Sequence, residues 1–342
     1  MKRSNNNVVV APVLLAACVA AALSSSASAH HSAAAFDTQT ETTITGTVTS
    51  YTFRNPHVYM ELERRLENGE QVKTEIEAGA ASVIGPLGFT RDAVQVGDVV
   101  NVVGNPGKRD PQGLLLGREL YKSDGTYLPL NISSRALDAN VVGSAESVAG
   151  IWFSPRTSFF AFLGGARNWP VTDKGQAAIA ASGEAPTAAK DCIPLGEPAL
   201  MFYPVANKID VFDDRVEMDV DWLDSKRVIW LDGREHPPAD ETSLHGHSIG
   251  HFEGTTLVVD STNFSFNPIG FSTGLPSGTG KHLTERFELG ADGLHMTYSG
   301  SMEDPEYLTA PVEWSGTVDY RPDMQLSNEM CDLETAQKFL DD

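Results

Sequence analysis

Positive charge is scarce in this sequence. Its 342 residues include 25 Lys and Arg against 46 Asp and Glu, which gives a formal net charge of −21. A surface of that sign repels nucleic-acid phosphates and the anionic headgroups of membranes. We therefore expect no nucleic-acid partner, and we interpret the acidity chiefly as a source of solubility.

Short motifs of nucleotide binding and nucleophilic catalysis are missing or weak. The sequence contains no phosphate-binding P-loop and no Gly-x-Gly-x-x-Gly fingerprint. The stretch His247-Ser248-Ile249-Gly250 resembles a hydrolase nucleophile motif only superficially. We therefore expect no bound nucleotide and no activated serine.

Long apolar runs are confined to the N-terminus. Lys2 and Arg3 precede an uncharged apolar run over 8–23, and small residues ending in Ala-x-Ala follow up to Ala29. This order is typical of a secretory signal peptide, and the run is too short and too rich in alanine for a membrane span. The sequence predicts a signal peptide over 1–29 and a periplasmic or secreted protein that begins at His30.

A second interpretation of the N-terminus is a lipoprotein signal. Leu15-Ala16-Ala17-Cys18 resembles a lipobox, in which Cys18 would carry lipid and anchor the chain to a membrane. We favour soluble export because apolar residues continue past the cysteine to Leu23.

Cysteine is rare as well. The three cysteines are Cys18, Cys192 and Cys331, and the first leaves with the signal peptide. The other two can pair in an oxidising compartment, and the alternative is two separate buried thiols. We predict the disulfide, which closes a loop long enough to contribute up to about 5 kcal/mol of stability.

The sequence is rich in short strand patterns separated by turn signals. Within 30–130, the alternation of Thr42 to Tyr51 has the period of two that is typical of a strand, and Asn68-Gly69 is typical of a hairpin turn. The other strand patterns are 58–63, 71–76, 96–104 and 114–121, and 78–89 suits a short helix or loop. Five strands with one helical insert predict a small barrel of the OB type.

The same region resembles a known family. The residues that carry the resemblance are His30-His31-Ser32, Phe36-Asp37, Thr45-Gly46-Thr47-Val48, Asn55-Pro56-His57-Val58 and 88–98. Together they are similar to DUF6152, a family of exported bacterial proteins. The resemblance covers about residues 30–130 and implies export and an OB-like barrel, but it implies no reaction.

A second β-rich unit follows. Residues 131–148 are small, polar and weakly patterned, which is typical of a linker, and 171–200 suits a loop with one helix over 173–181. Strand patterns occupy 215–220, 227–231, 256–260, 282–289, 294–299 and 312–320. We predict a mainly β protein in which 149–342 forms a larger antiparallel β-barrel or lipocalin-like domain.

This second half is also similar to a group of exported bacterial β proteins that has no name and implies no activity. The stretches concerned are 231–237, 246–260, 282–287 and 304–307.

The new N-terminus is a candidate metal site. Cleavage after Ala29 would free the α-amine of His30, which could then bind one metal ion together with the imidazole of the same residue. A further nitrogen from His31 or His57 would complete a set of ligands suited to copper. The alternative is that two histidines simply follow a permissive cleavage site.

A second candidate metal site is the His245-x-His247-x-x-x-His251 pattern. Its even spacing places three imidazoles on one face of a regular strand, where they could hold zinc or copper. Gly246 and Gly250 favour the alternative, in which these histidines belong to a polar loop.

A candidate acid–base site consists of His247, Asp260, His282, Glu285 and Asp304. These residues lie in or at the ends of predicted strands of one barrel, where buried charges must be paired or must line a wet pocket. A histidine beside a carboxylate is the usual acid–base unit because its pKa lies near neutrality. His282 and Glu285 are three positions apart, so they face opposite sides of a regular strand. The alternative is that Glu285 and Asp304 are structural ion-pair and turn residues.

Two functions of different class are open on the sequence alone. We favour binding of a small apolar molecule or a metal ion, because no nucleophile or cofactor motif is present. The alternative is a cofactor-free lyase, isomerase or hydrolase with a His–carboxylate pocket. Convergence of His247, Asp260, His282 and Glu285 in one cavity would favour the enzyme, and their dispersal around an apolar cavity would favour binding. No particular oligomeric state is indicated.

Overall fold

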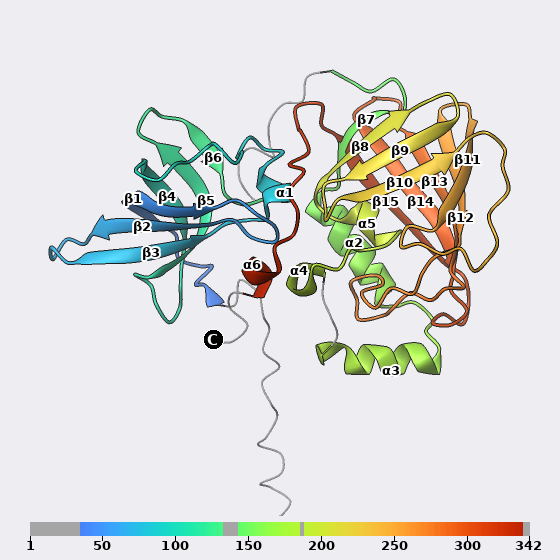
Figure 1. Cartoon of the computed structure of the whole chain (residues 1–342), viewed down its shortest axis with the longest axis horizontal. Helices are drawn as coiled ribbons and strands as arrows, with labels where there is room; N and C mark the ends of the chain where they lie inside the picture. Colours follow the sequence, from blue (N-terminus) through green and yellow to red (C-terminus); the bar gives the residue numbers. More distant parts are fainter. Residues whose placement is uncertain (1–34, 133–142, 185–187, 338–342) are drawn as a thin grey trace, which may run out of the picture. The chain divides into compact units, whose positions relative to one another are not determined.

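The structure is a computed structural model of the chain and describes residues 35–132, 143–184 and 188–337 (Figure 1). It is mainly β and contains two barrels, as predicted. The predicted signal peptide, the lipidation of Cys18 and the copper ligands His30 and His31 lie outside the described residues.

The first barrel is of the predicted OB type. Its five strands are β1 (Thr42–Thr52), β2 (Tyr59–Arg65), β3 (Gln71–Glu77), β4 (Val99–Pro106) and β5 (Leu114–Lys122), and the short strand β6 (Tyr127–Pro129) pairs with β5 outside the ring. β1 pairs with both β2 and β4, and a parallel β3–β5 pairing closes the ring. The short helix α1 (Ala81–Ile84) lies between β3 and β4, where the sequence indicated a helical insert.

Alternating side chains form the core of this barrel. Ile44 and Val48 of β1 are buried while the threonines between them are exposed. They belong to one apolar cluster with Leu62, Ile76 and Val102 from the neighbouring strands. The period of two in the sequence therefore corresponds to one face turned inward and one toward solvent.

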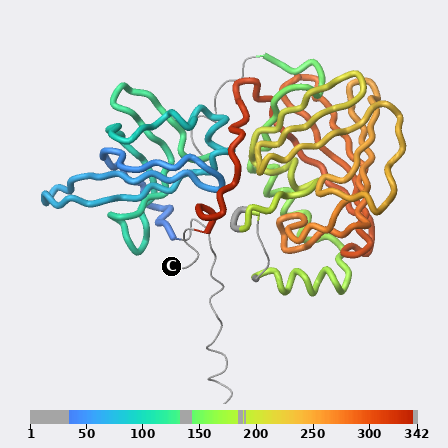
Figure 2. The backbone as a smooth tube through the Cα atoms, viewed as in Figure 1, coloured from blue at the N-terminus to red at the C-terminus, as the bar shows by residue number. Residues whose placement is uncertain are grey.

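The second barrel is a closed ring of nine strands. They are β7 (Gly150–Phe153), β8 (Ala206–Val211), β9 (Arg215–Val220), β10 (Ser225–Trp230), β11 (His247–Glu253), β12 (Thr256–Thr262), β13 (His282–Leu289), β14 (His295–Glu303) and β15 (Val312–Tyr320). The pairing of β7 with β15 closes the ring, and Figure 2 shows this unit coloured from green at its start through yellow to orange in its last strands. Every neighbouring pair is antiparallel except β10–β11, which is parallel.

Two helices and aromatic side chains contribute to the interior of this barrel. The two helices are α2 (Arg156–Ala166) and α5 (Ala199–Phe202), whose buried side chains belong to its apolar core. The other helices are α3 (Asp173–Ala181), of which only Gly175 is buried, α4 (Ala188–Asp191) and, near the C-terminus, α6 (Leu333–Gln337), and a 3-10 turn spans Ser182–Glu184. Phe162 of α2 stacks on Phe202 of α5 at 4.8 Å between ring centroids, and Phe202 lies 5.2 Å from Tyr298 of β14. The rings occupy space that an apolar ligand would need in a lipocalin-like barrel.

The parallel pair requires a crossover connection. A parallel neighbour cannot be reached by a hairpin, so residues 231–246, hereafter the crossover segment, leave the end of β10 and turn back before β11 begins beside it, with Ser248 opposite Ile229. The side-chain amide of Asn263 donates to the carbonyls of Pro237, Pro238 and Glu241 at 3.4, 2.7 and 3.2 Å. These bonds hold the segment against the end of β12.

The predicted disulfide is present. Cys192 and Cys331 are bonded, with 139 residues of separation and 5.7 Å between their Cα atoms. The segment around Cys331 also bonds the chain after β1, because the amide of Asn55 donates to the carbonyl of Glu329 and the carbonyl of Asn55 accepts from the backbone N–H of Asp332. Among the described residues, no helix has the length and apolar character needed to cross a bilayer.

Candidate acid–base site

Asp260 of β12 accepts hydrogen bonds from two imidazoles. Nε2 of His236 lies 2.9 Å from Oδ1, and Nε2 of His282 lies 2.7 Å from Oδ2. Nδ1 of His236 lies 2.9 Å from Nδ1 of His247. His247, His236, Asp260 and His282 thus form one continuous chain of hydrogen bonds, which we call the Asp260 cluster.

Strand period and register bring these residues together. In β12 the flanking residues Val259 and Ser261 are buried, so Asp260 faces outward. Leu283 of β13 is buried opposite Ser261, which leaves His282 outward beside Asp260. The Asp260 cluster therefore lies on the outer face of the barrel.

The fourth member, His236, comes from the crossover segment. That segment passes over the outer face, so His236 reaches Asp260 without belonging to a strand. The pKa of His247 is lowered, first by burial and then by the charges of His236 and Arg234, while Asp232 acts in the opposite direction.

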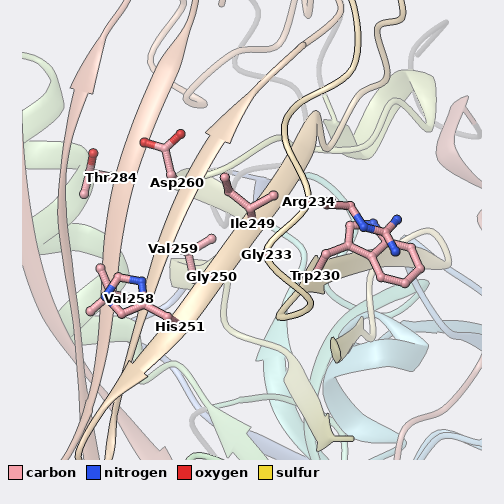
Figure 3. A pocket seen from close by; sticks show the side chains of 10 residues that line it. All are labelled: Trp230, Gly233, Arg234, Ile249, Gly250, His251, Val258, Val259, Asp260 and Thr284. Carbon is pink, nitrogen blue, oxygen red and sulfur yellow. The ribbon is translucent and has the colours of Figure 1, made fainter. Parts of the chain in front are cut away.

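An open hollow of about 460 Å³ adjoins Asp260 (Figure 3). Trp230 and Arg234 form one side, with the guanidinium carbon 3.5 Å from the indole centroid. Ile249 stands in the middle of the view, and Asp260 and Thr284 lie on neighbouring strands beyond it. Asp260 is the residue that the hollow and the cluster share, so a molecule in the hollow would meet a carboxylate already bound to two imidazoles.

Glu285 does not join this site. It points into the barrel, where Tyr298 donates to Oε1 at 2.7 Å and Arg227 donates to both carboxylate oxygens, at 3.0 Å to Oε1. All three side chains are buried. The geometry matches the expectation that His282 and Glu285 face opposite sides, and it favours a structural ion pair for Glu285.

Asp304 lies apart from the Asp260 cluster too. It follows β14, accepts from the backbone N–H of Gly278 at 2.8 Å, and its own carbonyl accepts from Tyr307 and Leu308 in a turn. Burial raises the pKa of Asp304 above its usual value. This environment favours the turn role over membership of the acid–base site.

The three spaced histidines diverge. His245 lies 3.1 Å from Oε1 of the buried Glu197, His247 belongs to the Asp260 cluster, and His251 lies 3.5 Å from Glu253. They therefore do not form the single set of ligands that the spacing offered as a candidate. In the ranges that the structure describes, no group of three or more His, Cys, Asp or Glu side chains is arranged to hold a metal ion.

His57, the third candidate copper ligand, lies in the first barrel just before β2. Its Nδ1 is 3.2 Å from the carbonyl of Ala78 and 3.4 Å from Oε1 of Glu77. Burial lowers the pKa of His57. The two other nitrogen donors proposed for copper, His30 and His31, lie outside the described residues.

Ser248 is not a nucleophile. With Gly246 included, the stretch up to Gly250 has the Gly-x-Ser-x-Gly spacing, but the structure places Ser248 within β11 and not on an exposed strand-to-helix turn. Its hydroxyl is buried and lies 3.0 Å from both Arg227 Nε and Ser261 Oγ.

One residue of the Asp260 cluster, His236, was missed from the sequence, and so was Arg227, the structural partner of Glu285. His236 lies in an irregular segment before Pro237, where no periodicity indicates the direction of a side chain. Arg227 was read only as part of a strand. Its inward position in β10 follows from the same period of two that places Ile229 in the core.

The fold and the site define a two-barrel protein with a His–Asp cluster on the outer face of its second barrel. Residues 17–115 match the model of DUF6152, a family of unknown function, which confirms the resemblance seen in the first barrel. No curated protein matches the chain.

Proposed function

We propose that the protein is exported and binds a small molecule in the hollow beside Asp260, on which the Asp260 cluster performs proton transfer. One observation carries the proposal: Asp260 both lines the hollow and accepts hydrogen bonds from His236 and His282. An imidazole held by a carboxylate is a general acid–base unit that works near neutral pH.

The hollow supports this proposal better than the barrel interior does. The interior is filled by aromatic rings and by the Arg227–Glu285 pair, whereas the hollow combines apolar Ile249 and Val258 with the polar Asp260. Binding without turnover is the second candidate, and the apolar lining of the hollow favours it.

Export is supported by two independent features. The N-terminal sequence has the order of a signal peptide, and the Cys192–Cys331 disulfide is of the kind that persists in oxidising compartments.

The test compares Asp260→Asn with a matched control on the same barrel. Asp292 and His295 form an exposed pair 2.7 Å apart, so His295→Gln removes an imidazole from a carboxylate outside the site. The mature full chain is incubated with a defined library of carbonyl compounds, amines and aromatic acids, and binding and consumption are followed by mass spectrometry.

We expect the wild type and His295→Gln to convert the same compound, while Asp260→Asn retains binding and loses conversion by about 100-fold or more. Equal conversion by Asp260→Asn would overturn the proposal. Binding without consumption by any variant would establish the second candidate in its place.

A further inference from the structure

The first barrel has a hollow of its own, of about 570 Å³, at the end where β1 begins and β2 ends. Its walls are residues between 40 and 44, the turn that joins β2 to β3, and residues from the end of β4 to Gln112. This volume lies within the range of small-molecule sites. The hollow shares no residue with the Asp260 cluster, so its ligand is independent of the function proposed above.

Two consecutive arginines at the end of β2 bring positive charge to this hollow. Arg64 lies on the inward face of the strand together with the buried Leu62, because side-chain direction alternates, and Arg65 is exposed at the last position of the strand. Both arginines line the hollow. The strand end therefore places two positive charges at one hollow of a protein whose net charge is −21.

Neutral groups hold the guanidinium of Arg64 in place. Its Nε donates to Oγ1 of Thr74 at 2.7 Å, and its Nη2 donates to the carbonyl and to Oε1 of Gln112 at 3.1 and 2.5 Å. The hydroxyl of Thr74, a residue that is 1% exposed, donates to the same carbonyl at 2.6 Å. The other amino group of Arg64, Nη1, has no hydrogen-bond partner in the part of the chain that the structure describes. The side chain is thus fixed while one amino group remains available to a ligand.

The two arginines lack a counterion. Within 35–132, 143–184 and 188–337, Arg64 and Arg65 form no ion pair, and Glu67, the acidic residue that lines the hollow beside them, forms none either. Burial lowers the pKa of Arg64, whereas hydrogen bonds to the carboxylate of Asp232 raise the pKa of Arg234. A partly buried charge without a partner is unfavourable, so an anion in the hollow would supply what the protein itself does not.

The rest of the lining suits a molecule with hydroxyl groups. Thr42 and Thr43 line the hollow, and among the described residues their hydroxyls have no hydrogen-bond partner, so each can both donate and accept. Leu66, Pro106 and Pro111 add apolar surface to the same walls. Hydroxyls beside apolar carbon are the two kinds of surface that a sugar ring presents.

We propose that this hollow binds a small sugar acid, whose carboxylate accepts hydrogen bonds from Arg64 and Arg65 and whose hydroxyls bond Thr42 and Thr43. A carboxylate has two oxygens and can accept from both guanidinium groups at once. A simple oxyanion would use only the charges, and a neutral sugar would use only the hydroxyls. The sugar acid therefore binds more tightly than either.

Calorimetric titration of the mature full chain tests this assignment with glucuronate, acetate, inorganic phosphate and glucose. We expect saturable binding of glucuronate, at least 10-fold tighter than binding of any of the other three. Arg65→Gln removes an exposed side chain that forms no ion pair in the described ranges, and it should weaken glucuronate binding at least 10-fold. The matched control is Arg167→Gln, which removes an equally exposed arginine at the end of α2 and should leave the affinity unchanged.

The role of Arg64 is tested in the wild type, because its bonds to Thr74 and Gln112 also support the fold. In protein with ¹⁵N-labelled arginine, the side-chain signals of Arg64 and Arg65 should move as glucuronate is added, with the midpoint found by calorimetry. The signals of Arg167 should stay in place. Static Arg64 signals at saturation would contradict the proposed contact.

Four results of the titrations would overturn the assignment to a sugar acid. They are the absence of saturable glucuronate binding, equal affinity of Arg65→Gln and the wild type, equal binding of glucose, and binding of acetate or phosphate as tight as that of glucuronate. None of them bears on conversion by the Asp260 cluster, so the two proposals fail separately.

Discussion

Arg227 and Glu285 show how a charged pair can exist inside a barrel. Both are almost fully buried, and their charges are met by each other, by Tyr298 and by the two hydroxyls of Ser248 and Ser261. Taking charges out of water is costly, so the loss of one partner leaves an uncompensated charge in a medium that cannot solvate it.

We expect Arg227→Met and Glu285→Gln each to lower the free energy of unfolding by about 3–5 kcal/mol, measured by urea denaturation. The control is Arg215→Ala, which breaks the half-exposed pair with Glu217 at 2.6 Å and should cost less than about 1 kcal/mol. A similar loss of unfolding free energy in Arg215→Ala and in the two interior variants would show that water reaches the Arg227–Glu285 pair.

Asp221 predicts a pH dependence of stability. It is 5% exposed, and burial raises its pKa to about 6, against the opposing effect of hydrogen bonds from Ser327 and Asn328. The folded protein therefore keeps a proton that the unfolded chain releases near pH 4. The contribution of Asp221 is fully present below pH 4 and is lost as the pH rises through 6, by up to about 3 kcal/mol.

The test is a comparison of the wild type with Asp221→Asn between pH 4 and 7.5. Their unfolding free energies should agree most closely at pH 4, and the variant should become relatively more stable as the pH rises. A constant difference across this range would contradict the assignment, because all other titrating groups cancel in the comparison.

Single residues also show where sequence reasoning works. The separation of His282 from Glu285 was predictable, because side-chain direction in a strand depends only on the period of two. The contact between His236 and Asp260 was not predictable, because it depends on the path of an irregular segment that no local pattern determines. Asp304 was predicted as a site residue because the direction of a side chain in the turn after a strand is likewise not determined by a local pattern.

At the scale of elements, the crossover segment decides whether the acid–base site exists. Asn263 fixes it through three carbonyls, and the backbone of Asn263 is left-handed, with a φ of 60°. Asn is one of the few residues other than glycine that adopt this conformation readily.

We expect Asn263→Ala to free the crossover segment, raising amide hydrogen exchange over 231–246 and destabilising the protein by about 1–3 kcal/mol. Asn263→Gly tolerates the backbone and lacks the same three bonds, so it isolates their loss from backbone strain. Unchanged exchange in both variants would show that other contacts hold the segment, and that His236 does not depend on Asn263 for its position.

Elements differed in how far the sequence predicted them. The helix over 173–181 and the strand over 282–289 match α3 and β13, since capping by Thr172 and regular alternation are local signals. The parallel pairing of β10 with β11 was not predictable, because it is a relation between segments and an antiparallel barrel was expected. α5 was missed because its four residues are too few for a helical period.

At the scale of the whole molecule, the disulfide closes most of the second unit. It joins Cys192, before α5, to Cys331, after the last strand, so every strand from β8 to β15 lies within the loop. Such a long loop has much conformational freedom to lose in the unfolded chain.

We expect the double substitution Cys192→Ser with Cys331→Ser to lower the free energy of unfolding by up to about 5 kcal/mol. It should also make the segment around Cys331 more sensitive to limited proteolysis, although the hydrogen bonds of Asn55 to Glu329 and Asp332 remain. Wild-type protein in reducing buffer should behave in the same way. Equal stability of the oxidised and doubly substituted proteins would refute the role of the bond.

Closure of the second barrel limits how copies of this protein can meet. Each of the nine strands has a neighbour on both sides, although β10–β11 and β15–β7 share two residue pairs each, so none of these strands is a free edge strand that a foreign strand could extend along its whole length. Any partner at this barrel must recognise side chains, and two copies approach one another with the same surplus of negative charge. Closure therefore disfavours recognition by strand addition at this barrel, and with it the fibrous association that can follow.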